Sequence, residues 1–552
     1  MLNFTLIEHH PRRVLESFRR GEFDQIEIIG EADEKEFFTL CFKEKILEAL
    51  SAAMPTRRKK EEVPRWFVLA ANLSLKLHRE NSFYAFERVV RCGGLLSALP
   101  PEVASKHLDP QTKQILLQCQ GFNDKNQYDR STPCDQDFLR KFVKDVGADR
   151  WTDWFNGPVQ EVFQANGFFD PAGVFIGDAS YLFVPDNPAY EGSVVMWFDE
   201  HNHPVQYEKL SVEGRKKAHR ERCYKLVSLL HLRGDCFVYA GVAVVAGNVH
   251  EGPVLFQLVE NFVKTVGKGV IKLLILDRGF VDGPNITRCK KEWEIEVLLP
   301  VKKNMDLWAD AWALAERASW QPCPLPTSAP AAPPPANRPE SIHRREQKRQ
   351  KTLATKKAQV PPPPPQEILT RTELCAIRGF NSWSPCAVPM NVLLLRDTFA
   401  DAHQEQWALM TTADFLRPQQ PKEQYESRVK IEERHRLLKC FYDLSDFHSQ
   451  SFNVIAAQVV FILLSYTLRQ WQLWRLRQEQ LAGKTPGFLE QSLNIQRSYV
   501  VIYHQDAYTQ MPLVSFTREL LEMRAEAQAK ALVKVRHLEE SLLTPMENLR
   551  PP

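Results

Sequence analysis

The sequence lacks several features that would assign it to a class at once. Its 552 residues include 11 cysteines, but no two of them have the CxxC spacing. That absence gives no support to a zinc site or a disulfide framework. The sequence also does not open with the basic and apolar leader typical of secreted proteins. Together these absences predict a protein of a reducing, cytoplasmic compartment.

Long hydrophobic runs are also scarce, although 44% of the residues are hydrophobic. The strongest run extends from Phe452 to Leu468, and it contains Asn453 and Gln458. A membrane-spanning helix needs about 20 predominantly apolar residues. We therefore expect a buried helix of a soluble protein here, and no membrane partner.

Glycine is less frequent than proline, with 23 against 37 residues. The prolines cluster between residues 321 and 366, around a basic stretch at 338–357 that contains eight Lys or Arg and two Glu. Such a segment has too few apolar side chains to form a core, so we predict a disordered basic loop. The formal net charge of +3 does not by itself indicate a nucleic-acid partner.

The remaining pattern is typical of an α/β protein. Residues 1–165 have mostly helical spacing, and apolar strands then alternate with helices, which predicts a sheet covered on both faces. The predicted strands are 173–178, 194–198, 237–245, 271–277, 295–302, 391–396 and 406–412, and the predicted helices are 252–266, 285–293, 422–442, 452–472 and 516–541.

Two acids follow apolar runs in this pattern. Asp178 and Asp277 each come after four or five apolar residues and are predicted to end a strand. A single Asp at such a point most often caps the next turn. If the two strands are neighbours, however, both carboxylates lie at the edge of the sheet where ligands bind. Two such acids repel each other unless a divalent cation lies between them.

A third acid belongs to a stripe on the predicted helix 422–442. Tyr425, Arg428, Glu432 and Lys439 lie at offsets of 0, 3, 7 and 14. At about 100° per residue these side chains fall within an arc of roughly 60°. His435 lies on the same stripe, whereas Glu433 is rotated by about 100° away from Glu432. One acid among cations and hydroxyls suits a surface that binds a metal and a phosphate together.

Asp178, Asp277 and Glu432 are thus the candidate metal ligands. Three carboxylates favour Mg²⁺, with Mn²⁺ as the alternative. Two such ions about 3.5–4 Å apart can activate an attacking oxygen and stabilise a leaving one.

Three motifs carry a resemblance to a known family. They are Ile-Gly-Asp178-Ala-Ser, Leu-Asp277-Arg-Gly-Phe, and Tyr-x2-Arg-x3-Glu-x6-Lys from Tyr425 to Lys439. Over residues 170–470 the chain resembles bacterial DDE transposases of the insertion-sequence-four family. The resemblance implies an RNase H-like core that is interrupted by an insertion, and an enzyme that cuts DNA at transposon ends and joins the 3′-OH to target DNA.

The resemblance also implies roles for individual residues. Asp178, Asp277 and Glu432 would hold two Mg²⁺ ions per active site, and Tyr425, Arg428 and Lys439 would contact phosphates. Trp407 would stack on a flipped base, the alternative being an aromatic buried beneath the insertion. Arg278, Lys302 and Lys303 would contact the DNA backbone, the alternative being that they are ordinary charged residues of the surface.

The implied partners are the terminal inverted repeats and the target DNA, bound by a homodimer on paired ends, in the bacterial cytoplasm with the nucleoid. Two alternative functions stay open. One is an RNase H-like structure-specific nuclease that cuts without joining, and the other is a catalytically silent DNA-binding protein derived from a transposase. The predicted domains are a mainly helical DNA-binding domain (1–165), the first part of the core (166–303), the insertion (304–415), the second part of the core with Glu432 (416–475), and a helical C-terminal region suited to dimerisation (476–552).

Overall fold

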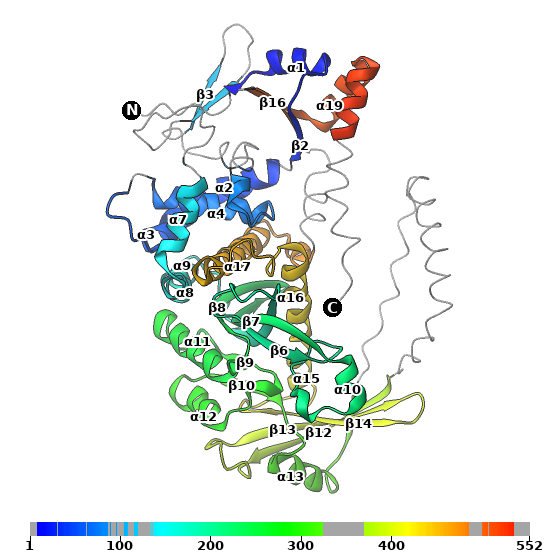
Figure 1. Cartoon of the computed structure of the whole chain (residues 1–552). Coiled ribbons are helices and arrows are strands. Elements are labelled where there is room, and N and C mark those ends of the chain that lie inside the picture. Colours follow the sequence, from blue (N-terminus) through cyan, green and yellow to red (C-terminus); the bar gives the residue numbers. More distant parts are fainter. Residues whose placement is uncertain are drawn as a thin grey trace. The chain divides into compact units, whose positions relative to one another are not determined.

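The structure is a computed structural model of the chain, and it describes residues 8–29, 31–61, 63–86, 89, 95, 104–108, 115–119, 134, 136–323, 369–484, 499–505 and 507–534 (Figure 1). The chain divides into two compact units. The first contains residues 1–281, 291–295 and 427–552, and the second contains residues 282–290 and 296–426. Each unit is described by itself.

A mixed β-sheet forms the centre of the first unit. Strand β5 (Val174–Val184) runs parallel to β9 (Leu273–Ile275) on one side and antiparallel to β7 (His219–Arg233) on the other. The far edge of β7 pairs with β6 (Val194–Phe198) over its first residues and with β8 (Cys236–Ala246) over the rest. This part of the chain is therefore an α/β structure with both parallel and antiparallel pairs.

Strand β5 presents different residues to the two faces of this sheet. Gly177 faces helix α11 (Glu251–Val266), because a Cβ atom added there would lie 2.4 Å from Leu255 Cδ2. Successive residues of a strand point to opposite faces. Asp178 therefore points to the other face, towards helix α16 (Val429–Phe441).

Helix α17 (Phe452–Arg475) is the central helix of the first unit and corresponds to the predicted buried helix. It contacts β8 and the helices α4 (Arg65–Leu77), α7 (Gln136–Val146) and α8 (Ala148–Asn156) (Figure 1). The helix is long and apolar enough to cross a membrane, but 89% of its most apolar window is buried in the protein. The core of the first unit therefore covers most of its hydrophobic surface.

Segments from both ends of the chain form a second, four-stranded sheet in this unit. Its order is β1–β16–β15–β2, and helices α1 and α19 pack on it. Phe18, Phe23 and Phe516 lie in its core, and Arg19 forms a bidentate pair with Glu519 at 2.7 and 2.8 Å. The bounds are β1 Glu8–His9, α1 Pro11–Arg19, β2 Gln25–Ile29, β15 Tyr499–His504, β16 Ala507–Pro512 and α19 Leu513–Glu522.

The first unit also contains the helices α2 (Glu31–Lys43), α3 (Ile46–Ala52), α9 (Pro158–Ala165) and α10 (Val212–Lys217) and the hairpin of β3 (Ala104–Leu108) and β4 (Ile115–Cys119).

The second unit is built on an antiparallel sheet of order β11–β12–β13–β14–β10. Helix α13 packs against β12 and β13, and α15 contacts β10 and β14. The bounds are β10 Glu296–Pro300, α13 Asp306–Ala315, β11 Gln321–Cys323, β12 Leu369–Phe380, β13 Met390–Phe399, β14 Gln404–Thr411 and α15 Gln420–Glu426; most of α12 (Gly283–Glu292) also belongs here.

Several expectations from the sequence differ from the structure. Asp178 does not end its strand, because the strand-forming residues after it continue to pair with β7 as far as Val184. The predicted helix 422–442 is two helices, α15 and α16, interrupted at Ser427 and Arg428. Strand β7 was not predicted. The C-terminal region is not only helical, because its β-branched and aromatic run 499–503 forms β15.

Most of the predicted disordered segment 321–366 lies outside the described residues. Its first three residues, Gln321–Cys323, form strand β11 against β12 and are therefore not disordered.

Candidate active site

The three predicted metal ligands converge on one guanidinium group. Arg428 Nη1 lies 2.9 Å from Glu432 Oε1, and Arg428 Nη2 lies 3.1 Å from Asp277 Oδ2 and 4.0 Å from Asp178 Oδ1. Asp178 Oδ1 and Asp277 Oδ2 both lie near the same atom, Arg428 Nη2, so these two oxygens are close to each other. Residues that are distant in the sequence thus form one carboxylate cluster.

The exposure of the three acids increases from the sheet outwards. The side chain of Asp178 is 12% exposed, that of Asp277 40% and that of Glu432 60%, while Arg428 is 14% exposed. The cluster is therefore anchored in the protein at Asp178 and open to solvent at Glu432.

The sheet register brings the two Asp residues together. Ile176 of β5 pairs with Ile275 of β9 in parallel. Asp178 and Asp277 each lie two residues beyond this pair, so they occupy matching positions on two adjacent segments of the sheet. In a parallel pair such positions lie side by side.

At each Asp the two oxygens face different groups, and one of them is directed at the cluster. Asp277 Oδ1 accepts a hydrogen bond from the backbone N–H of Arg278 at 2.6 Å, as the cap of the short helix η3 (Arg278–Phe280). Asp178 Oδ2 lies 3.0 Å from His435 Nδ1. The capping role and the metal-binding role are thus compatible at Asp277, because they use different oxygens.

Helix α16 supplies the remaining groups of the cluster. Arg428 is its N-terminal cap residue, and at this point Lys430 N–H donates to the Ser427 carbonyl at 3.3 Å and Ile431 N–H donates to the Arg428 carbonyl at 2.9 Å. Arg428, Glu432, His435 and Lys439 follow one another at intervals of four, three and four residues, which places them on one face of a helix. Burial lowers the pKa of Lys439, and the negative charge of Asp178 opposes that shift.

The sequence pattern placed His435 on this face but did not indicate its partner. The ring is only 6% exposed, and within the described part of the chain its Nε2 has no hydrogen-bond partner. The signal available in the sequence was its position one turn after Glu432. Only the three-dimensional structure identifies Asp178 as the group it contacts.

Whether the cluster suits a divalent cation can be judged from its donors. Three carboxylates are the ligands that Mg²⁺ and Mn²⁺ prefer. In the described residues, no group of three or more His, Cys, Asp and Glu side chains has the spacing of a formed metal site. Here the guanidinium of Arg428 lies among the carboxylates and supplies the positive charge that they need. The donor set therefore fits a divalent cation once Arg428 turns away.

The other predicted site residues are distributed over both units. Arg278 is exposed beside Asp277 in the first unit. The second unit holds Tyr425 in α15, Lys302 and Lys303 after β10, and Trp407 in β14. Trp407 is partly exposed, and its indole N–H donates to Asp397 Oδ2 at 2.7 Å on the neighbouring strand. Lys303 Nζ lies 5.8 Å above the ring of Trp308.

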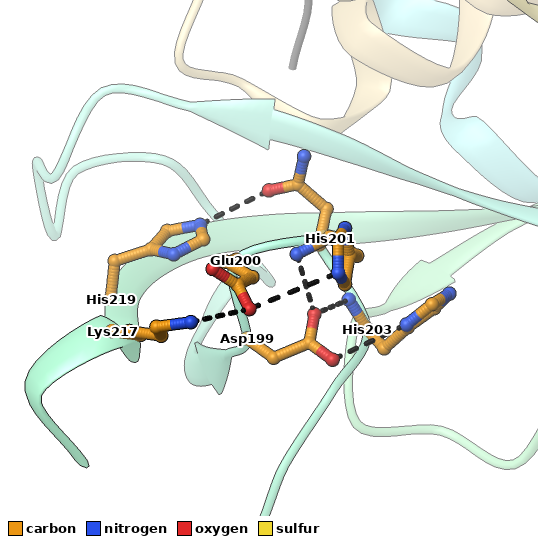
Figure 2. A network of polar contacts seen from close by, with 7 residues as sticks. Asp199, Glu200, His201, His203, Lys217 and His219 are labelled. Atoms are coloured by element: carbon orange, nitrogen blue, oxygen red, sulfur yellow. Dashed lines mark hydrogen bonds and ion pairs between the residues drawn. The ribbon is translucent and has the colours of Figure 1, made fainter. Parts of the chain in front are cut away.

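A second group of acids and histidines occupies the connection between β6 and β7 (Figure 2). Asp199 Oδ1 accepts hydrogen bonds from the backbone N–H groups of His201 and His203, both at 2.8 Å. The hydrogen bond from the His203 backbone is the main cause of the lowered pKa of Asp199. Glu200 pairs with Lys217 at 3.0 Å. These contacts stabilise the conformation of the loop, and we assign them a structural role.

Comparison with known proteins identifies the family. Residues 190–468 match the family model described as "Transposase DDE domain". The chain belongs to this DDE transposase family. The matched range includes Asp277, Glu432 and Lys439, whereas Asp178 precedes it. Members of the family are phosphoryl-transfer enzymes and generally use divalent metals.

Two further comparisons add little to this DDE transposase assignment. The chain is similar to a cryo-EM structure of a piggyBac transposase synaptic complex with hairpin DNA, at 10% sequence identity and a TM-score of 0.34, covering 83% of this chain and 80% of the other. A similarity of this size carries no argument about the site. Comparison with curated proteins gave no match.

Proposed function

We propose that this DDE transposase cuts DNA at the ends of a transposon and joins the freed 3′-OH to target DNA, as members of the insertion-sequence-four family do. The observation that carries the proposal is the convergence of Asp178, Asp277 and Glu432 on Arg428. Three converging carboxylates have no use in a protein that only binds DNA, because they repel phosphate. In this proposal the sheet around β5 belongs to an RNase H-like core.

Asp178, Asp277 and Glu432 would hold two Mg²⁺ or Mn²⁺ ions. When bound, such ions activate the attacking oxygen and stabilise the leaving oxygen in an in-line displacement. The residues of the chain orient these ligands. One oxygen of Asp277 is fixed by the Arg278 backbone N–H, which leaves Oδ2 directed at the cluster.

Arg428 and Lys439 would bind phosphates of the DNA end, and Tyr425 is proposed as a separate phosphate contact. Arg428 can exchange its carboxylate partners for a phosphate, which it can contact with two parallel N–H groups. We infer that the guanidinium occupies the acid cluster before DNA binds and leaves it when a phosphate and the metal ions arrive. Arg278, Lys302, Lys303 and Trp407 are proposed as further DNA contacts, the partners being the transposon ends and the target, with a homodimer on paired ends in the bacterial cytoplasm.

The test is a cleavage and joining assay with DNA that carries the inverted repeats flanking the coding region. The wild-type chain with Mg²⁺ should give strand-transfer joints between these ends and a target plasmid. Asp178→Asn should bind the ends with unchanged affinity but neither cut nor join them, because binding depends on cationic contacts. Asp235→Asn, an exposed acid paired with Lys430, is the matched control and should act as the wild type does.

The products distinguish this function from the alternatives. A nuclease with the same core would release free ends without any joints, and a silent binding protein would retain the ends uncut. Normal cutting by Asp178→Asn would remove Asp178 from the metal site.

A further inference from the structure

His435 is the buried partner of the most buried acid of the cluster. Its ring is 6% exposed and its Nδ1 lies 3.0 Å from Asp178 Oδ2. A carboxylate oxygen can only accept a hydrogen bond, so a proton on Nδ1 makes this contact favourable. The contact thus pairs one ring nitrogen of His435 with one carboxylate oxygen of Asp178.

The two oxygens of Asp178 face two different groups. Oδ2 lies beside His435 Nδ1, and Oδ1 faces Nη2 of the Arg428 guanidinium, which Asp277 and Glu432 also contact. Asp277 shows the same division, because the Arg278 backbone N–H holds its Oδ1 and leaves Oδ2 for the cluster. Both Asp residues thus offer one oxygen each, and in both cases a nitrogen donor selects which one.

We propose that His435 is a positioning residue, which holds Asp178 so that Oδ1 is the oxygen available to the metal ion. The proposal rests on the metal-binding function proposed above. Partners of this kind keep a metal-binding carboxylate in one orientation, and their loss typically weakens metal affinity by about 10- to 100-fold. Helix α16 would then supply both Glu432 as a ligand and His435 as the anchor of another ligand.

The choice of substitutions makes this proposal testable at the level of one atom. In His435→Asn the side-chain amide nitrogen can occupy the position of Nδ1, so a donor beside Asp178 is retained. In His435→Gln the amide nitrogen reaches the position of Nε2 instead, and in His435→Ala no donor remains. His231→Asn is the matched control, because His231 is also a buried histidine beside an acid, at 3.6 Å from Asp170, but it belongs to β7 and not to the cluster.

The measurement is a Mn²⁺ titration of each full-length variant, followed by electron paramagnetic resonance, together with the thermal midpoint of each variant in metal-free buffer. We expect His435→Ala and His435→Gln to raise the Mn²⁺ Kd about 10- to 100-fold, and His435→Asn to stay within about threefold of the wild type. His231→Asn should lower the thermal midpoint without changing the Mn²⁺ Kd.

Two results would overturn the proposal. One is an unchanged Mn²⁺ Kd in His435→Ala, and the other is an equal loss in the Asn and Gln variants, which would show that the ring and not its Nδ1 donor matters. Asp277→Asn separates this proposal from the proposed function. If Asp277→Asn binds Mn²⁺ as the wild type does, the metal site itself is wrong; if it loses Mn²⁺ while His435→Ala does not, only the role of His435 is refuted.

Discussion

The competition between Arg428 and the metal ions gives the sharpest prediction. The guanidinium of Arg428 lies 2.9 to 4.0 Å from oxygens of all three acids. A divalent cation must enter the same group of carboxylates, and the two positive charges repel each other. Arg428→Ala should therefore bind Mn²⁺ more tightly than the wild type when DNA is absent.

The size of the effect follows from the exposure of the cluster. Two unit charges about 4 Å apart interact by about 1 kcal/mol in water, so a guanidinium and a divalent ion repel each other by about 2 kcal/mol. The dielectric of water is the appropriate choice, because the side chains of Asp277 and Glu432 are 40% and 60% exposed. We therefore expect the Mn²⁺ Kd of Arg428→Ala to fall by about 30-fold.

The assay is a Mn²⁺ titration of the DNA-free protein by electron paramagnetic resonance. Arg222→Ala is the matched control, because Arg222 is 13% exposed and pairs with Asp186 at 3.1 Å, away from the three acids. Its Mn²⁺ Kd should not change. The same Arg428 variant should bind transposon-end DNA more weakly, with its salt slope reduced by about 0.9 per lost phosphate contact. An unchanged or weaker Mn²⁺ affinity in Arg428→Ala would refute the competition.

Three other predictions concern DNA binding, pH and stability. Lys439→Ala should reduce the salt slope of end binding by about one unit, whereas Lys430→Ala, on the opposite face of α16, should not. Burial lowers the pKa of His231 to about 4. Between about pH 6.5 and pH 4 the unfolded chain therefore binds a proton at this residue that the folded chain does not bind. The free energy of unfolding falls in that range by up to about 1.4 kcal/mol per pH unit as the pH is lowered. His231→Gln should remove that slope from the pH dependence of urea unfolding. Phe461→Ala should lower the free energy of unfolding by about 3–5 kcal/mol.

The outcomes that contradict these predictions are equally specific. An unchanged salt slope would make Lys439 an ordinary surface lysine. A pH slope that persists in His231→Gln would assign it to another group. The ring of Phe461 is buried between Trp151 and Trp154 at 5.1 and 6.2 Å, so a loss no greater than that of Leu476→Ala, at the exposed end of α17, would contradict the proposed core.

The candidate acids could be chosen from the sequence because their signals are local. Asp277 directly follows an apolar run, and Glu432 belongs to a stripe with a fixed spacing. Strand β6 was predicted with its observed bounds for the same reason, because Gly192-Ser193 precede its apolar run and Asp199-Glu200 follow it. Such patterns depend only on residues that are close together in the sequence.

The partners of these residues could not be predicted, because they depend on packing between distant segments. Nothing near His435 in the sequence indicates Asp178. The helix 422–442 contains no Gly or Pro to mark its interruption, which coincides with the contacts that Arg428 makes to the acids. Strand β7 was missed although the mainly apolar residues 226–230, interrupted only by Ser228, fit a buried strand, because charged residues precede them.

The most direct test of the account compares two adjacent glutamates on helix α16. Glu432 and Glu433 are both exposed, but only Glu432 contacts Arg428 in the acid cluster. With Mg²⁺ and transposon-end DNA, Glu432→Gln should cut at least about 100-fold more slowly than the wild type, because a metal ligand contributes several kcal/mol to the reaction. Glu433→Gln should cut at the wild-type rate. Equal rates in the two variants would contradict the assignment of Asp178, Asp277 and Glu432 as one catalytic metal site.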